Sequence, residues 1–222
     1  MKAISSRSEE IRIQADGVGL DGNLEVPAHA AGIVLFAHGS GSSRHSRRNQ
    51  FVARSLREAG MGTLLFDLLT REEEEIEQHT AHLRFDIEML ARRLVAATRW
   101  ARGGTDLGTL PIGYFGASMG GGAALVAAAE IPEEVRAVVS RGGRPDLAGE
   151  ALGKVRPPTL LIVGGWDGPV IEMNREAFRK LNCVKRIEIV PEATHLFEEP
   201  GKLEEVARLS AGWFAEHFRS EA

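Results

Sequence analysis

Residues 116–120 contain a serine between two glycines, in the pattern G-x-S-x-G. An apolar run at 112–115 comes before this pattern, and an alanine-rich segment of high helix propensity follows it. Between a strand and a helix, such a turn exposes the serine hydroxyl above the end of a sheet. With 25 glycines in 222 residues, the pattern alone could also be a glycine-rich turn carrying an ordinary serine. The flanking strand and helix favour Ser118 as a nucleophile.

Asp167 and His195 each follow the end of another expected strand, as Ser118 does. A serine hydroxyl is a poor nucleophile at neutral pH and needs a base within hydrogen-bond reach. His195 is the candidate base, and Asp167 would fix the tautomer of its ring and stabilise the imidazolium. Ligands bind beyond the carboxyl ends of parallel strands, so the three side chains are expected to meet there. The alternatives are a loop histidine without a role and an ordinary turn aspartate.

A catalytic serine also needs hydrogen-bond donors for the oxyanion of the tetrahedral intermediate. The backbone amide of Met119, directly after the nucleophile, is the first predicted donor. The second is the amide of Ser40, in the loop after the apolar run at 33–37, where Gly39 lets the backbone turn inward. His38 is expected to orient this loop by hydrogen bonding rather than to take part in catalysis.

Three arginines follow strand ends on the same expected side of the sheet, Arg44, Arg141 and Arg144. Two guanidinium groups there could clamp a carboxylate or phosphate of the substrate with paired hydrogen bonds. Solvated loop arginines, or ion pairs with the glutamates at 72–75, explain the same residues equally well. With His38 and Gly39 they form the candidate substrate-binding set.

Apolar runs alternate with helical segments along the chain. The expected strands are 10–14, 20–26, 33–37, 61–66, 112–115, 135–140, 159–163 and 186–190. Besides the helix that follows the G-x-S-x-G turn, helices are expected at 46–59, 83–102, 170–181 and 203–218. Strands separated by helices predict an α/β fold with a mostly parallel sheet covered on both faces. The first two strands, joined by a hairpin turn at 16–19, are expected to extend the sheet in antiparallel fashion at one edge.

Two further sequence patterns could indicate a cofactor site or a metal site, but we expect neither site here. Residues 17–22 match G-x-G-x-x-G, but they lie between two strand signals with no helix after them, so a dinucleotide site is not expected. Residues 68–82 hold a run of glutamates followed by His79 and His82. Like charges this dense are typical of a solvated face or loop, and surface histidines are preferred here to metal ligands.

The composition, with 43% hydrophobic and 26% charged residues, suits a single α/β domain over residues 1–222. A net charge of -4 argues against a nucleic-acid surface, which would need clustered Lys and Arg. The first residues lack the apolar core of a secretory signal, and no apolar run is long enough to span a bilayer. We therefore expect a soluble cytoplasmic protein, monomeric or homodimeric, with a small-molecule substrate and no nucleic-acid or membrane partner.

On these motifs the chain resembles the α/β-hydrolase superfamily, and within it the small dienelactone-hydrolase-like proteins. The resemblance covers nearly the whole chain and implies an α/β-hydrolase fold, with an eight-stranded, mostly parallel sheet flanked by helices. It also implies a serine-esterase mechanism with Ser118 as nucleophile, Asp167 as acid and His195 as base. True dienelactone hydrolases carry a cysteine at the elbow, so the dienelactone substrate does not follow. Only about 20 residues separate 135–140 from 159–163, where many lipases insert a cap, so no large cap domain is expected.

The predicted function is hydrolysis of small carboxylic esters, thioesters or lactones through an acyl-enzyme. A cofactor-free perhydrolase or haloperoxidase-type activity uses the same triad, and the sequence does not separate the two. A third alternative is a non-catalytic binding protein of the same fold. Such proteins usually lose a triad member, whereas this chain keeps all three. A dehalogenase is disfavoured, because its elbow would carry an aspartate at the position of Ser118.

Overall fold

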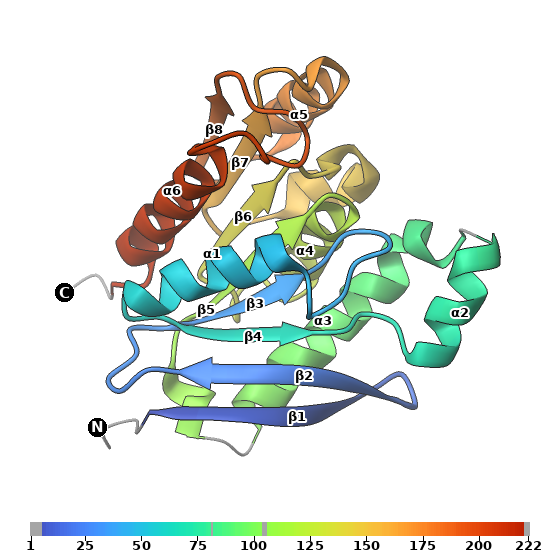
Figure 1. Ribbon diagram of the computed structural model, residues 1–222, viewed down its shortest axis with the longest axis vertical. Helices are drawn as coiled ribbons and strands as arrows, with labels where there is room; N and C mark the ends of the chain where they lie inside the picture. Colours follow the sequence, from blue (N-terminus) through green and yellow to red (C-terminus); the bar gives the residue numbers. More distant parts are fainter. Residues whose placement is uncertain (1–5, 81, 104–105, 220–222) are drawn as a thin grey trace.

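Eight strands form a single sheet in the order β1-β2-β4-β3-β5-β6-β7-β8 (Figure 1). The computed structural model describes residues 6–80, 82–103 and 106–219. The strands are β1 (Arg7–Ala15), β2 (Val18–Val26), β3 (Ile33–Ala37), β4 (Gly62–Phe66), β5 (Ile112–Ala117), β6 (Ala137–Arg141), β7 (Thr159–Gly164) and β8 (Lys185–Val190). The β1–β2 and β2–β4 pairs are antiparallel, and the pairs from β4 to β8 are parallel. This confirms the mostly parallel eight-stranded sheet.

The hairpin at one edge of the sheet turns more tightly than the sequence suggested. Ala15 pairs with Val18, so Asp16 and Gly17 alone form the turn, and both have positive φ angles, 50° and 79°. Two-residue turns of this kind match the twist of the flanking strands. The antiparallel extension at the edge is thereby confirmed, and the G-x-G-x-x-G pattern lies within this hairpin.

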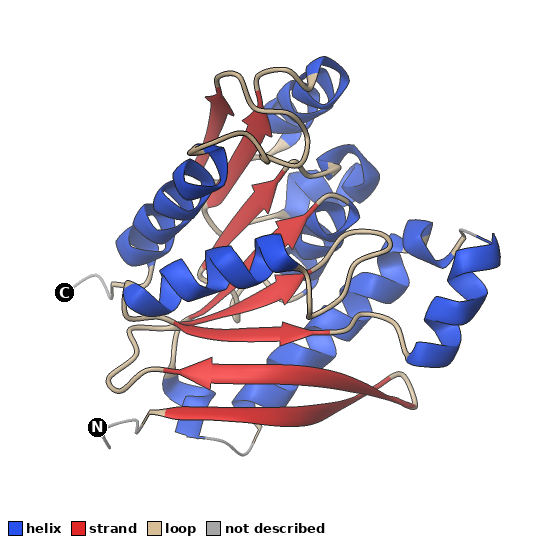
Figure 2. Cartoon of the chain, viewed as in Figure 1, coloured by secondary structure: helices blue, strands red, loops and turns tan. Residues whose placement is uncertain are grey.

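The helices cover both faces of the sheet (Figure 2). The α-helices are α1 (Arg47–Glu58), α2 (Arg71–Thr80), α3 (Ile87–Arg102), α4 (Met119–Glu130), α5 (Gly168–Lys180) and α6 (Lys202–His217). Short 3-10 segments lie at Leu83–Phe85, Asp106–Thr109 and Pro145–Lys154. The last of these segments lies between β6 and β7, so no large cap domain is inserted there.

Side chains of β3 alternate between the two layers of the core. Val34 and Phe36 pack with α1 and α6, whereas Leu35 and Ala37 pack with α3 and α4 on the opposite face. Because successive strand residues point to opposite faces, a strand buried on both sides must be apolar at every position. That is why the central strands appear in the sequence as continuous apolar runs.

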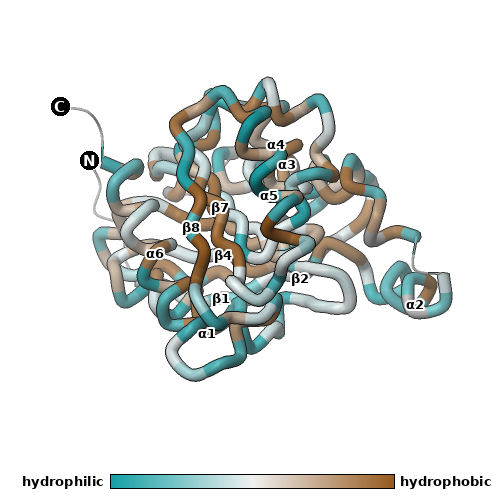
Figure 3. The backbone as a smooth tube through the Cα atoms, turned by 90° about the horizontal axis from the view of Figure 1, so that it is seen from above, coloured by the Kyte–Doolittle hydropathy of each residue, from teal (hydrophilic) through white to brown (hydrophobic). Residues whose placement is uncertain are grey.

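The acidic segment at 68–82 is the main departure from the expected elements. Residues 71–80, expected as a solvated face or loop, form helix α2, and this helix stands at the edge of the molecule (Figure 3). Thr70 and Glu73 cap it reciprocally: the Thr70 amide donates to the Glu73 carboxylate at 2.8 Å, and the Glu73 amide donates to Thr70 Oγ1 at 3.2 Å. Such a capping box stabilises a helix start despite the like charges.

Helix α3 begins later than expected, because Asp86 caps it. The Asp86 carboxylate accepts a hydrogen bond from the Met89 amide at 2.9 Å, and residues 83–85 form a separate 3-10 turn.

In the described ranges, no helix combines the length and apolar sequence needed to cross a membrane.

Candidate active site

Ser118 lies at a strained turn between β5 and α4. Its backbone has a φ of 52° and a ψ of -122°, which a non-glycine residue adopts only under constraint from its surroundings. A Cβ on Gly116 would lie 2.4 Å from the Gly120 carbonyl oxygen, and one on Gly120 would lie 2.1 Å from that of Ala37. Both positions therefore require glycine, and the turn has the geometry of a nucleophile elbow.

Asp167 and His195 are in direct contact. The Nδ1 atom of His195 lies 2.7 Å from Oδ2 of Asp167, whose side chain is largely buried. An ionised carboxylate can only accept a hydrogen bond, so this contact places the imidazole proton on Nδ1 and leaves Nε2 as the basic nitrogen. The contact is the one expected between the predicted base, His195, and the predicted acid, Asp167.

The end of β6 links the elbow to the histidine loop. The Ser118 amide donates to the Arg141 carbonyl at 3.2 Å, and the next residue, Gly142, has a φ of 51°. A Cβ on Gly142 would stand 3.5 Å from Nδ1 of His195, so the ring packs directly beside this backbone. The Trp166 amide donates a hydrogen bond to the Ala193 carbonyl at 2.9 Å, and this bond joins the Asp167 loop to the His195 loop.

The loop after β3 lies against Ser118. A Cβ on Gly39 would be 2.9 Å from Cβ of Ser118 and 3.7 Å from its Oγ, so Gly39 backbone atoms approach the serine closely. Met119 is the first residue of α4. Amides at a helix start have no partner within the helix and are available to an oxyanion. The structure thus brings the predicted oxyanion residues to the same side of the sheet as Ser118.

His38 is buried, and both of its ring nitrogens bond to backbone groups. Nε2 accepts from the Leu68 amide at 2.9 Å, so Nδ1 carries the proton and donates to the Gly39 carbonyl at 2.9 Å. Burial lowers the pKa of His38 below its ordinary value, which keeps the ring neutral. The Gly39 carbonyl and the Ser40 N–H belong to one trans peptide and point in opposite directions. His38 therefore fixes the orientation of the Ser40 amide.

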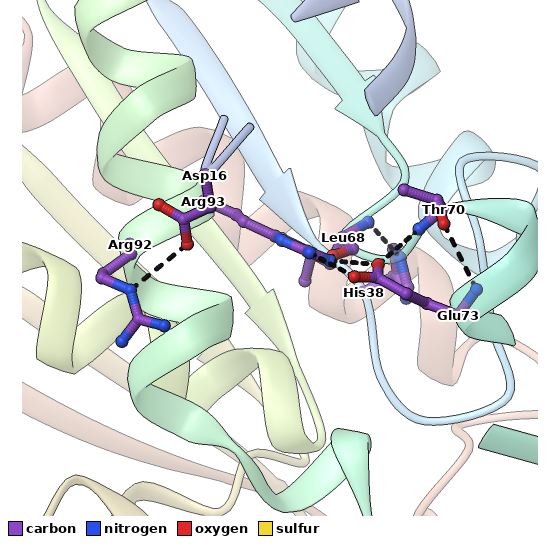
Figure 4. Close-up of polar contacts among 7 residues, drawn as sticks. All are labelled: Asp16, His38, Leu68, Thr70, Glu73, Arg92 and Arg93. Carbon is purple, nitrogen blue, oxygen red and sulfur yellow. Dashed lines mark hydrogen bonds and ion pairs between the residues drawn. The ribbon is translucent and has the colours of Figure 1, made fainter. Parts of the chain in front are cut away.

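Leu68 is held from its other side by a buried arginine (Figure 4). Nη1 of Arg93 donates to the Leu68 carbonyl at 2.6 Å, and the guanidinium binds both carboxylate oxygens of Glu73 at 2.6 Å. The hydrogen bonds from Arg93 hold the pKa of Glu73 below its usual value. This network was not predicted from the sequence. The Thr-x-x-Glu spacing at 70–73 is the signal that could have indicated its capped helix.

The three candidate arginines lie in different surroundings. Arg44 forms an ion pair with Asp67, and Arg144 binds Asp146 through two hydrogen bonds of 2.9 and 2.7 Å. Arg141 is buried, donates to Asn49 Oδ1 at 3.2 Å, and lies 5.9 Å from the ring centre of Phe197. Burial lowers the pKa of Arg141 to about 10. The described partners of Arg44, Arg144 and Arg141 are therefore Asp67, Asp146 and Asn49. A role in substrate binding stays a prediction.

A cavity of about 1090 Å³ lies between the β1–β2 hairpin, the loop after β3 and the start of α2. Its lining includes Arg12, Arg44 and Thr70. Ser118, Asp167 and His195 are not among its lining residues.

Within the described part of the chain, no group of three or more His, Cys, Asp or Glu side chains is placed to hold a metal ion.

Residues 20–215 match the sequence model of the dienelactone hydrolase family. The chain belongs to this family. A crystal structure of dienelactone hydrolase from Anabaena variabilis is 59% identical to it, with a TM-score of 0.94, over 96% of this chain and 99% of that one. A lidless α/β serine hydrolase from Xanthomonas campestris shares the fold at 21% identity, with a TM-score of 0.78 over 99% of both chains. Family membership supports a hydrolase.

Two curated proteins from Mycobacterium tuberculosis, provisionally named phosphoribosyl transferases, are 56% identical over 211 residues. The match covers 95% of this chain but 47% of each relative. The chain therefore spans about half the length of these relatives. Their name refers to proteins about twice as long as the matched region.

Proposed function

We propose that this protein is a serine hydrolase that cleaves small carboxylic esters, thioesters or lactones. Ser118 is the nucleophile, His195 the base and Asp167 the acid. The observation that carries the proposal is the 2.7 Å contact between His195 Nδ1 and Asp167 Oδ2, on the same edge of the sheet as the strained Ser118 elbow. Family membership agrees with it.

In this mechanism Oγ of Ser118 attacks the acyl carbon while Nε2 of His195 removes the hydroxyl proton. The carbonyl oxygen becomes an oxyanion, which the amides of Ser40 and Met119 stabilise. Collapse of the intermediate breaks the bond to the leaving group, which takes its proton from His195. Water then attacks the acyl-enzyme by the same sequence of steps. Acid is released, and Ser118 regains its proton.

The serine at the elbow bears on the substrate. A serine depends on its base more strongly than a cysteine does, because a thiol is already partly ionised near neutral pH. Ordinary esters suit such a serine at least as well as dienelactones do. The net charge of -4 supports a small molecule, rather than a nucleic acid, as the substrate. For the Mycobacterium tuberculosis relatives, we propose that the matched half is a hydrolase region within a longer protein.

Labelling with a fluorophosphonate tests this assignment. The reagent forms a covalent adduct with an activated serine, and mass spectrometry of the digested protein locates it. We expect the adduct on Ser118, and no adduct on the His195→Ala variant under the same conditions. An adduct on any other serine would overturn the site.

A further inference from the structure

A small recess opens beside the proposed oxyanion loop. Its volume is about 20 Å³, which is room for a methyl-sized group or one water molecule. Gly39, Ser40 and Met119 line it on the side of the nucleophile. The leucines Leu68, Leu69 and Leu90 form the apolar part of its wall, and Glu74 and Glu77 also line it. A substrate carbonyl bound by the two oxyanion amides would therefore place one of its substituents in this recess.

The chemistry decides which substituent this is. His195 must protonate the leaving group, so the alcohol part of an ester lies beside that ring. None of the described residues that line the recess comes from the Asp167 or His195 loops. The recess is consequently on the acyl side of the carbonyl carbon.

The leaving-group side is different in character. Trp166 precedes Asp167 and is 64% exposed, and Leu196 follows His195 and is 37% exposed. The hydrogen bond from the Trp166 amide to Ala193 joins the two loops that carry these side chains. An open surface with exposed apolar groups can accept a larger alcohol part.

The walls of the recess are firmly held. The Leu68 amide donates to His38 and the Leu68 carbonyl accepts from Arg93, so both polar groups of this residue are fixed. Leu90 is buried on α3, within the main hydrophobic core. A close-packed wall does not move aside easily for an added methylene.

We propose that this recess is the acyl site and that it restricts the protein to esters of very short acyl groups, acetyl above all. This inference rests on the proposed function. A methylene in excess of a pocket costs roughly 10- to 200-fold in kcat/KM. Acetyl esters are therefore hydrolysed at least tenfold better than butanoyl esters of the same alcohol, and hexanoyl esters are poorer still.

The test compares p-nitrophenyl acetate, butanoate and hexanoate on the wild type, on Leu90→Ala and on Leu94→Ala. Leu94 is an equally buried leucine one turn further along α3, and it is not among the residues that line the recess. We expect Leu90→Ala to raise the butanoate-to-acetate ratio of kcat/KM at least tenfold, and Leu94→Ala to leave it unchanged. Leu69→Ala serves as a second enlarging variant if Leu90→Ala does not fold.

The outcomes separate this inference from the proposed function. Equal hydrolysis of all three esters by the wild type would overturn the acyl site alone, as would an equal shift in Leu90→Ala and Leu94→Ala. If no ester is hydrolysed above the level of Ser118→Ala, the proposed function fails and the acyl site fails with it.

Discussion

The Nδ1 atom of His195 and the Oδ2 atom of Asp167 lie 2.7 Å apart, although 28 positions separate the two residues in the chain. Asp167 follows β7 and His195 follows β8, and these strands are parallel neighbours. Parallel pairing brings the carboxyl ends of both strands to one edge of the sheet. The contact is thus a consequence of the topology.

Replacing Asp167 with Asn tests this contact. The amide keeps nearly the same shape but can donate to Nδ1, which would favour the tautomer in which Nε2 carries the proton and cannot act as a base. By analogy with the Ser-His-Asp template, we expect kcat for p-nitrophenyl acetate to fall roughly 10³- to 10⁴-fold. Asp146→Asn, which neutralises the carboxylate paired with Arg144, is the control and should stay within a few fold of the wild type. A loss below tenfold in Asp167→Asn would exclude the orienting role.

His38 gives a second prediction, concerning the oxyanion loop. His38→Gln loses the paired hydrogen bonds to Leu68 and Gly39, so the Ser40 amide is no longer held in one orientation. Loss of an oxyanion donor costs about 10²- to 10³-fold in kcat, and we expect loss of its positioning to cost roughly 10- to 100-fold, with little change in KM. Steady-state kinetics of His38→Gln beside His45→Asn, an exposed histidine in the same loop, measures this. A rise in KM with unchanged kcat would contradict it.

The buried neutral His38 also predicts a pH dependence of stability. Its pKa in the folded protein lies below 6.5, the ordinary value that the unfolded chain retains. The contribution of neutral His38 to the free energy of unfolding is therefore fully present above pH 6.5. It is lost as the pH falls toward the pKa of His38 in the folded protein. In that window the free energy of unfolding should fall by up to about 1.4 kcal/mol per pH unit.

Urea unfolding between pH 7.5 and 5 measures this slope for the wild type and for His38→Gln. The variant should show the shallower decline, because it lacks the group that takes up a proton on unfolding. Parallel curves for the two proteins would show that other groups cause the acid sensitivity.

Breaking the ion pair between Arg93 and Glu73 should lower the free energy of unfolding without moving Ser118, Asp167 or His195. Only 3% of the Arg93 side chain is exposed, and 24% of that of Glu73. Removing one partner of a fully buried pair costs 3–5 kcal/mol. Because Glu73 is partly solvated, we expect about 2–3 kcal/mol for Glu73→Gln. Chemical denaturation measures it, with Glu75→Gln, an exposed neighbour on α2, as a control expected to lie within about 0.5 kcal/mol of the wild type.

The features predicted best from the sequence are those in which steric constraints limit the residue type. Strands buried on both faces must be apolar throughout, and the elbow needs glycine at 116 and 120, so both features could be recognised without coordinates. Helix α2 was missed because the dense negative charge outweighed the Thr70–Glu73 cap in the prediction. The pairing of Arg93 with Glu73 joins positions 20 residues apart, and no local pattern encodes it.

The arginines show a second limit. Arg44 and Arg144 follow strand ends, as predicted, and Arg141 is the last residue of β6 rather than the first after it. A long side chain can turn toward any acceptor within its reach. Arg44 turns to Asp67, whereas Arg141 is buried against Asn49. Position in the chain could therefore place their backbones but could not show which groups their guanidiniums contact.

The most direct test of the proposed function is the turnover of p-nitrophenyl acetate by Ser118→Ala, with Ser43→Ala as a control in the loop after β3. The triad acts as a unit, so loss of the nucleophile should lower kcat by about 10⁴- to 10⁶-fold. The control should keep the wild-type rate. If Ser118→Ala retains more than one hundredth of the wild-type kcat, Ser118 is not the nucleophile and the proposed mechanism is wrong.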